Sequence, residues 1–340
     1  MTNKIKPLLI LLIAFGLAYW FVSRLDLHTV GGYLKTARIW PLALGALLIM
    51  ITLFVRSLRW QAFLAPIAKV GIRNLFGATS IGFGSIFVIG RAGEIVRPAI
   101  LSLHERIRPS ATLATILVER IFDSSAVVLI FAVNLLFFEL PSLQQSRNQQ
   151  MSAIRTVGAM LFAGVIIGII VLVVLKLKVD LVLPWLEKRT ARLPLKLATP
   201  VLNFIRHLAD GLGVLLNFKA LATTVFYTFC VWGLVSGATW LTLYAFGQSV
   251  NLSQIIFILG FGLVGSVVPT PGGSAGAFHA AAAKSMEFLG FEPNLAASIA
   301  IVYHLIAFGP PFLIGLYFLI KDDISVNQLR EMMASESAVQ

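Results

Sequence analysis

The chain has 340 residues, of which 58% are hydrophobic and 12% are charged. Soluble domains average about 45–50% apolar and about 25% charged residues, so this composition argues against a soluble globular enzyme and rules out a disordered chain. The 27 Lys and Arg residues outnumber the 15 Asp and Glu residues, yet no basic stretch carries a nucleic-acid-reading motif. We therefore predict an all-α polytopic membrane protein that binds no nucleic acid.

Six stretches are apolar enough to cross a membrane, which takes about 20 mostly apolar residues. The first could be mistaken for a signal peptide, but it lacks a small-residue cleavage site and more spans follow it. The predicted spans are Pro7–Val22, Pro41–Val55, Leu113–Phe138, Ile154–Leu175, Leu221–Phe246 and Leu295–Ile320. Two further apolar stretches, Leu75–Leu101 and Ile255–Leu289, are interrupted by glycine and proline.

Loop charges orient these spans, because cytoplasmic loops carry an excess of Lys and Arg. Loop 56–73 holds four basic residues, Arg56 and Arg59 among them, and no acid; loop 176–219 holds eight basic and three acidic residues. We expect both loops in the cytoplasm. The loops expected outside are 139–153, 247–253 and, despite its charge of +2, 24–38. The protein is then a multi-pass membrane protein with both termini in the cytoplasm.

The two interrupted segments must fit this orientation. Leu75–Leu101 is too short for two full spans and a turn, so we predict a re-entrant hairpin that enters from the cytoplasm. Ile255–Leu289 enters from outside, as a hairpin or as a tight pair of spans. Gly84-Ser85 in the first segment resembles Gly265-Ser266 in the second. Paired interrupted segments in two inverted halves are the sequence pattern of a transporter binding site. Alternatively, these glycines only permit close helix packing.

The second segment contains a stretch that can hardly continue a helix, because proline lacks the backbone N–H. A broken helix presents unpaired N–H groups and a positive dipole end, both of which suit an anionic group. We therefore assign the binding of an anionic substrate group, such as a lipid headgroup, to Pro269, Thr270, Pro271, Gly272, Gly273 and Gly276.

Two charged motifs lie in apolar surroundings, where each charge costs roughly 2.5–3.5 kcal/mol and therefore usually pairs or faces a cavity. They are Arg91-Ala-Gly93-Glu94-Ile-Val-Arg97 and Glu119-Arg120-Ile-Phe-Asp123. We predict that Glu119 or Asp123 bridges to Arg91 or Arg97, and that one arginine is left to bind phosphate oxygens. The headgroup-binding candidates from these motifs are Arg91, Gly93, Glu94, Arg97 and Arg120. Glu119 and Asp123 are candidates for coupling or ion pairing. The alternative is an ion-pair staple that only fixes the hairpin.

Other polar residues have weaker patterns. His279 follows the second break and His304 lies in the last span; each is a candidate for proton relay, or else a packing residue. The stretch 180–210 is predicted to be an amphipathic cytoplasmic connector, or a plain polar one, and 321–340 a polar tail. The single cysteine, Cys230, forms no internal disulfide and offers no zinc cluster. No Walker, G-x-S-x-G, HExxH or CxxC motif occurs, so we expect no metal and no cofactor.

The charged motifs, taken in order with Pro269-Thr270-Pro271-Gly272-Gly273, resemble the flippase-like family, also called the lysylphosphatidylglycerol synthase transmembrane region. The resemblance covers roughly residues 10 to 320. It implies a polytopic helical protein of a bacterial- or archaeal-type inner membrane with two re-entrant segments. In the best-known members this region flips an aminoacylated phospholipid. Those members also carry a cytoplasmic aminoacyl-transferase domain. Only 20 residues follow Ile320, so we expect a stand-alone membrane domain without synthase activity.

The chain departs from the family in one motif. Many relatives place a glutamate a few residues past the glycines, in a pattern like GGxGxxE, whereas here His279 stands near that place with an offset of one residue. A mechanism that needs a carboxylate there is not expected of this chain. A histidine relays protons instead, or the substrate differs.

These observations favour a lipid flippase that moves an anionic or modified lipid, phospholipid or polyprenyl-linked, across the inner membrane. An integral membrane enzyme acting on a lipid headgroup is the first alternative, and a scaffold in envelope-lipid assembly is the second. A membrane lipid is the expected substrate. A synthase partner in the membrane or cytoplasm and self-association into a homo-oligomer both stay open.

Overall fold

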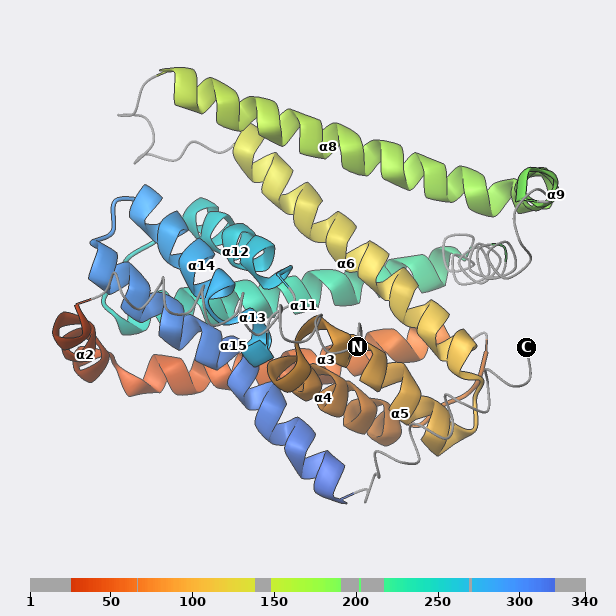
Figure 1. Ribbon diagram of the computed structural model, residues 1–340, viewed down its shortest axis with the longest axis horizontal. Coiled ribbons are helices and arrows are strands. Elements are labelled where there is room, and N and C mark those ends of the chain that lie inside the picture. The colour runs from red at the N-terminus through yellow and green to blue at the C-terminus, as the bar shows by residue number, and fades with distance from the viewer. Residues whose placement is uncertain are drawn as a thin grey trace, which may run out of the picture.

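The computed structural model describes residues 26–65, 67–137, 148–190, 202, 217–268 and 271–321. All regular structure within these ranges is helical, which confirms the predicted all-α class (Figure 1). The elements are α2 Leu27–Thr36, α3 Ile39–Leu64, α4 Ile72–Ile89, η1 Gly90–Ile95, α5 Val96–Glu105, α6 Pro109–Phe137, α8 Asn148–Leu177, α9 Val179–Thr190, α11 Phe218–Ala245, α12 Leu252–Ser266, α13 Pro271–Ser274, α14 Ala277–Phe288 and α15 Pro293–Lys321. The predicted span Pro7–Val22, most of the connector beyond residue 190 and the tail after residue 321 lie outside the described residues.

Four helices are long and apolar enough to cross a membrane: α3, α11, α15, and α8 over Arg155–Leu177. They correspond to four of the predicted spans. Helix α6 corresponds to a fifth and is 29 residues long. Its apolar sequence is interrupted by Glu119, Arg120 and Asp123, and these three side chains prove central to the site.

The boundary of the second span is corrected by the structure. The span was expected to end at Val55, with Arg56 and Arg59 in a cytoplasmic loop. Instead α3 continues to Leu64, and Arg56 and Arg59 are buried in its last turns. The helix continues because its next apolar residues, such as Trp60, pack into a core with α4, α5 and α6. Acidic groups on α6 compensate the buried charges.

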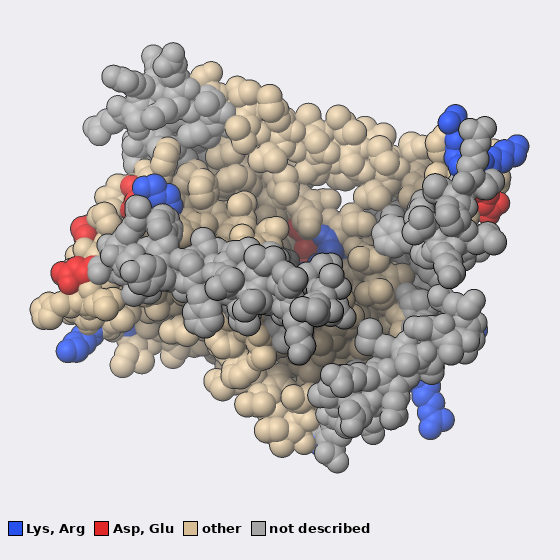
Figure 2. All heavy atoms as spheres, in the orientation of Figure 1, with Lys and Arg blue, Asp and Glu red and all other residues tan. Residues whose placement is uncertain are grey.

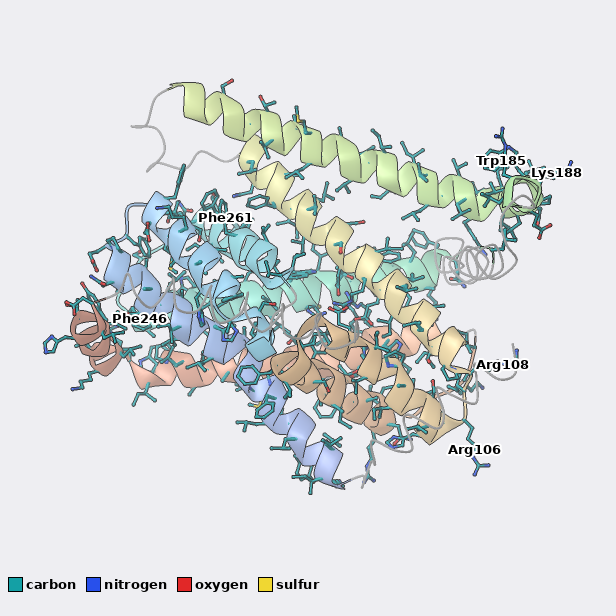
Figure 3. The ribbon with its side chains drawn as sticks, in the orientation of Figure 1. Arg106, Arg108, Trp185, Lys188, Phe246 and Phe261 are labelled. Atoms are coloured by element: carbon teal, nitrogen blue, oxygen red, sulfur yellow. The ribbon has the colours of Figure 1, made fainter. Side chains whose placement is uncertain are left out.

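The ends of the helices define two ends of the molecule. Helices α3 and α8 finish at the end where α6 and α11 begin (Figure 1). Figure 3 shows Arg106 and Arg108 at this end, in the turn before α6, together with Trp185 and Lys188 of α9. The concentration of basic residues agrees with the side that we predict to be cytoplasmic.

Both interrupted segments fold as helical hairpins. Helices α4 and α5 pack against each other with η1 at the turn, and α12 and α14 pack against each other with α13 at the turn. The first hairpin opens toward the start of α6 and the second toward the start of α15, at the opposite end (Figure 1). The two turns meet, because α13 packs against α4 and η1. Their depth in a lipid bilayer stays a prediction.

Glycines set the spacing within these hairpins. A Cβ atom added to Gly93 would lie 2.5 Å from the backbone nitrogen of Ile86, and one added to Gly265 would lie 2.6 Å from the carbonyl oxygen of Ala277. Both distances are too short for any side chain. These two glycines therefore permit close approach of the hairpin arms, which is the packing role that the sequence left open.

Candidate functional site

Helices α3, α5 and α6 bring six charged side chains into one buried network. The network comprises Arg56, Arg59, Arg97, Glu119, Arg120 and Asp123. Each carboxylate contacts three guanidinium groups, and each arginine contacts at least one carboxylate. Charges removed from water require such pairing, because an isolated ion in an apolar medium is very costly.

Arg59 lies at the centre of the network and is fully buried. Its Nη1 donates to Asp123 Oδ1 at 2.6 Å and its Nη2 to Asp123 Oδ2 at 2.9 Å, a bidentate pair. Nη2 also reaches Glu119 Oε1 at 3.0 Å, and Nη1 reaches Thr228 Oγ1 at 3.0 Å. Arg59 thus ties α3 to α6 and to α11, as its planar fork of donors allows.

Arg97 of the first hairpin joins the network through one nitrogen. Its Nη1 lies 2.9 Å from both carboxylate oxygens of Glu119, which confirms the predicted bridge between the two motifs. Its guanidinium lies over the Trp60 ring at 4.0 Å, and Trp60 Nε1 donates to Thr115 Oγ1 at 2.9 Å. A Cβ atom on Gly82 would lie 2.5 Å from Arg97 Cβ, so glycine there makes room for the arginine.

The network keeps a positive excess. Four guanidinium groups face two carboxylates, which leaves two positive charges. Glu94 of η1 interacts electrostatically with Arg120 and offsets part of this excess. The described network therefore favours an anion.

A cavity of about 420 Å³ adjoins the network. Its wall is largely apolar and comes from both hairpins and from α3, α6, α8, α11 and α15. Four charged residues line it: Arg56, Glu94, Arg120 and Asp123. Figure 2 shows basic and acidic atoms together at the bottom of a hollow near the centre of one face. Arg59, Arg97 and Glu119 are not part of this lining, so they support the wall from behind.

The second break also contributes to the cavity. Gly272 and Gly273 have φ values of 75° and 63°, and Ser274, which lines the cavity, has a φ of 65°. This left-handed conformation is unfavourable for serine. The Ser274 hydroxyl compensates by donating to the carbonyl oxygens of Ser266 at 2.9 Å and Val268 at 2.7 Å, which lie at the end of α12. Residues 272–274 of the break therefore have a defined conformation.

The two histidines lie behind this turn. Their ring centroids are 4.7 Å apart, and His304 Nε2 lies 3.1 Å from the carbonyl oxygen of Gly273. The backbone N–H of Gly276 donates to His279 Nδ1 at 3.4 Å. Neither histidine lines the cavity. In this arrangement the histidines pack against the break, and a proton-relay role stays a prediction.

Other predicted residues divide into three groups. Glu94 and Arg120 reach the cavity, whereas Gly93, Gly272 and Gly273 shape the backbone around it. The side chains of Arg91 and Pro271, and the whole of Pro269 and Thr270, lie outside the described residues.

Sequence reasoning missed Arg56 and Arg59 as site residues. They are three positions apart on one helix face, and the apolar pattern continues through Trp60 to Leu64 without a helix breaker. That continuity was the available signal, because a charge inside a longer apolar helix indicates a buried, paired role. Phe83 and Trp232, which also line the cavity, carried no such signal.

A scan against family models matches the lysylphosphatidylglycerol synthase TM region over residues 8–315. The chain belongs to this family. A search of curated proteins and a search of solved structures give no match. Membership of the lysylphosphatidylglycerol synthase TM region family, with the four apolar helices, establishes a multi-pass membrane protein related to lipid modification or translocation.

This family member offers no metal site among the residues that the structure describes, since they contain no cluster of three or more His, Cys, Asp or Glu side chains. What the geometry offers instead is a set of guanidinium donors at the wall of an apolar cavity. Such a wall is chemically complementary to an amphiphile with an anionic group.

Proposed function

We propose that this protein is a lipid translocator that moves an anionic or modified phospholipid across a bacterial-type inner membrane. One observation carries the proposal: a largely apolar cavity, enclosed by helices of membrane-spanning character, bears Arg56 and Arg120 on its wall. A lipid headgroup and the start of its chains have matching chemistry. The volume of about 420 Å³ lies within the usual range of about 300–1,000 Å³ for small-molecule sites.

Arg120 is the best placed to contact the phosphate. Its side chain is 26% exposed, in contrast to the fully buried Arg59. Its Nη2 is engaged by Glu119 and Asp123, but its Nε has no hydrogen-bond acceptor among the described residues. Nε is buried, but a phosphate oxygen in the cavity would reach the exposed part of this guanidinium. Charge-assisted hydrogen bonds of this kind are about twice as strong as neutral ones.

The arrangement of the hairpins supports movement between two sides. They open toward opposite ends of the molecule and their turns meet beside the cavity. In transporters built from inverted halves, a fixed central site is opened to one side and then the other by rocking of the two halves. We assign the basic end to the cytoplasm, with both termini there.

A vesicle assay tests the proposal. Purified protein is reconstituted into phosphatidylcholine vesicles that contain a trace of fluorescent phosphatidylglycerol, and dithionite bleaching reports the fraction transferred from the inner leaflet. We expect transfer above that of empty vesicles, and a greater rate for phosphatidylglycerol than for phosphatidylcholine carrying the same fluorophore, with and without a proton gradient.

Arg120→Gln is the decisive variant and Arg108→Gln is its control. Arg108 is an exposed arginine in the turn before α6 (Figure 3), so its loss removes the same charge without touching the cavity. Transfer should fall at least tenfold in Arg120→Gln and stay unchanged in Arg108→Gln. Normal transfer in a folded Arg120→Gln protein would overturn the site, and no transfer of any lipid by the native protein would overturn the translocator.

A further inference from the structure

A second cavity lies beside the cavity of about 420 Å³ described above, which we call the headgroup cavity. It has a volume of about 410 Å³ and lies between α6, α8 and α11. Its lining is apolar except for the hydroxyls of Ser125 and Thr228. No charged residue is among those that line it. We call it the chain groove, and its chemistry differs from that of the headgroup cavity, which carries four charged residues.

Trp232 of α11 joins the two cavities, because its side chain lines both. The residue is only 9% exposed, yet its indole Nε1 has no hydrogen-bond acceptor among the described residues. A buried indole N–H usually has a partner. Nε1 itself has almost no exposed surface, so it is the indole ring of Trp232 that borders both cavities.

Thr228 gives a second link between the chain groove and the charged network. It lines the groove, and its hydroxyl accepts a hydrogen bond from Arg59 Nη1 at 3.0 Å. Thr228 lies one helical turn along α11 from Trp232, so this part of the groove is directly beside the buried ion pairs. An occupant that extends through both cavities would have a charged end and a long apolar end.

We infer that the chain groove holds a hydrocarbon chain of the lipid whose phosphate lies in the headgroup cavity, with the Trp232 ring against that lipid at the junction. The inference rests on the proposed function and adds a requirement for the substrate. The substrate is a lipid whose hydrocarbon chain binds to the protein, so a lipid with the same headgroup and a short chain is a poor substrate.

The position of α8 favours a lipid chain over a protein segment. Only 6% of the most apolar stretch of α8 is buried, and this helix packs mainly against α6 and α9. The outer face of this helix, with side chains such as Ile167 and Ile170, therefore faces hydrocarbon. In a bilayer the groove therefore borders lipid, so a lipid hydrocarbon chain can enter the groove with little displacement. The lining offers two hydroxyls and no charged residue, which suits a hydrocarbon chain better than a polar peptide segment.

Tryptophan quenching by brominated chains tests the inference directly. The chain has six tryptophans, and we would keep only Trp60 and Trp232, with phenylalanine at the other four. Trp60 is fully buried and gives an unquenched background. The protein is reconstituted in phosphatidylglycerol with dibrominated acyl chains and compared with the same lipid without bromine. A further Trp232→Phe change isolates the Trp232 signal.

A reference protein with an exposed tryptophan calibrates the quenching. A protein that keeps Trp60 and Trp240 has a tryptophan that is 42% exposed, so bulk lipid quenches it. Plugging variants then separate the groove from the surface. Val173→Phe lines the groove, whereas Val174→Phe adds the same ring at a neighbouring exposed position of α8. Ala126→Phe plugs the groove from α6.

We expect Trp232 to be quenched at least half as much as Trp240, and each plugging variant to reduce that quenching at least twofold while Val174→Phe leaves it unchanged. Quenching of Trp232 no greater than that of Trp60 would overturn the groove, and so would quenching that ignores both plugging variants. Lipid transfer without quenching of Trp232 would contradict the chain groove and leave the proposed translocator intact. Quenching without lipid transfer would contradict the translocator and leave chain binding in the groove intact.

Discussion

Arg59 and Asp123 form a bidentate pair across two helices, with Nη1 2.6 Å from Oδ1 and Nη2 2.9 Å from Oδ2. Sequence charge counting placed Arg59 in a cytoplasmic loop and Asp123 in a span. Their contact shows that the charged motif of α6 is completed by α3 as well as by the first hairpin. The site is therefore assembled from three elements, α3, α5 and α6.

Glu119→Gln should strongly destabilise the protein. Glu119 is fully buried and contacts Arg59, Arg97 and Arg120. Removal of one partner of a buried ion pair costs about 3–5 kcal/mol, because the remaining charge stays buried. Glu287→Gln changes the same group in a surface pair with Lys284 at 2.7 Å, where the expected cost is about 0–1 kcal/mol.

Thermal unfolding in detergent, followed by circular dichroism, measures the difference. We expect a marked fall in the unfolding temperature for Glu119→Gln and almost none for Glu287→Gln. If the two variants unfold at the same temperature as the native protein, the network does not stabilise the fold. In that event the buried ion pairs of Glu119 would serve substrate binding and not stability.

The close contact within the second hairpin gives another stability prediction. Gly265→Ala places a methyl group 2.6 Å from the carbonyl oxygen of Ala277, and overpacking of this kind costs about 1–3 kcal/mol. Gly233→Ala on α11 has nothing within 4 Å and should be neutral, or gain up to about 1 kcal/mol in helix propensity. Unfolding temperatures of the two alanine variants check this, and an unaffected Gly265→Ala protein would contradict the hairpin packing.

The sequence predicted the helices better than the site. Hydropathy located α8, α11 and α15 to within a few residues, because each is a long apolar run. The end of α3 was wrong, because a charge count treats Arg56 and Arg59 as loop residues wherever they stand. Their true position depends on carboxylates about 60 residues away in the chain, a tertiary contact that no local pattern encodes.

Within the site, spacing predicted one contact and left the others out of reach. The bridge from Glu119 to Arg97 followed from the cost of unpaired charge in a membrane. Which arginine faces the cavity could not follow from spacing, since Arg97 lies against Trp60 while Arg120 reaches the cavity. Aromatic side chains such as Phe83 are too common in membrane helices to mark a site by themselves.

Cysteine labelling tests the assignment of the two ends. The only native cysteine is Cys230, so Cys230→Ser provides a background free of thiols. Arg108→Cys lies at the basic end (Figure 3), and Lys284→Cys, at a side chain that is 71% exposed, lies in the second hairpin. A membrane-impermeant maleimide added to intact cells should label Lys284→Cys and should label Arg108→Cys only after lysis. The reverse pattern would invert the topology.

Phe83 should prove important for transport through the arginines that surround it. The guanidinium carbons of Arg56, Arg120 and Arg97 lie 4.9, 5.9 and 6.0 Å from its ring centroid, and the residue lines the cavity. A cation near an aromatic face gains about 0.5–2 kcal/mol, with the larger values where water is excluded.

Phe83→Leu keeps an apolar side chain but removes this attraction, so Arg56 and Arg120 lose a common anchor on the cavity wall. We expect transfer of fluorescent phosphatidylglycerol to fall about three- to thirtyfold, as the factor that about 0.7–2 kcal/mol represents. Phe54→Leu is the control, because Phe54 is a largely exposed ring of α3 that packs edge-on against Phe76. Equal transfer by the two leucine variants would show that Phe83 only fills space, and the arginines would then owe their positions to Glu119 and Asp123 alone.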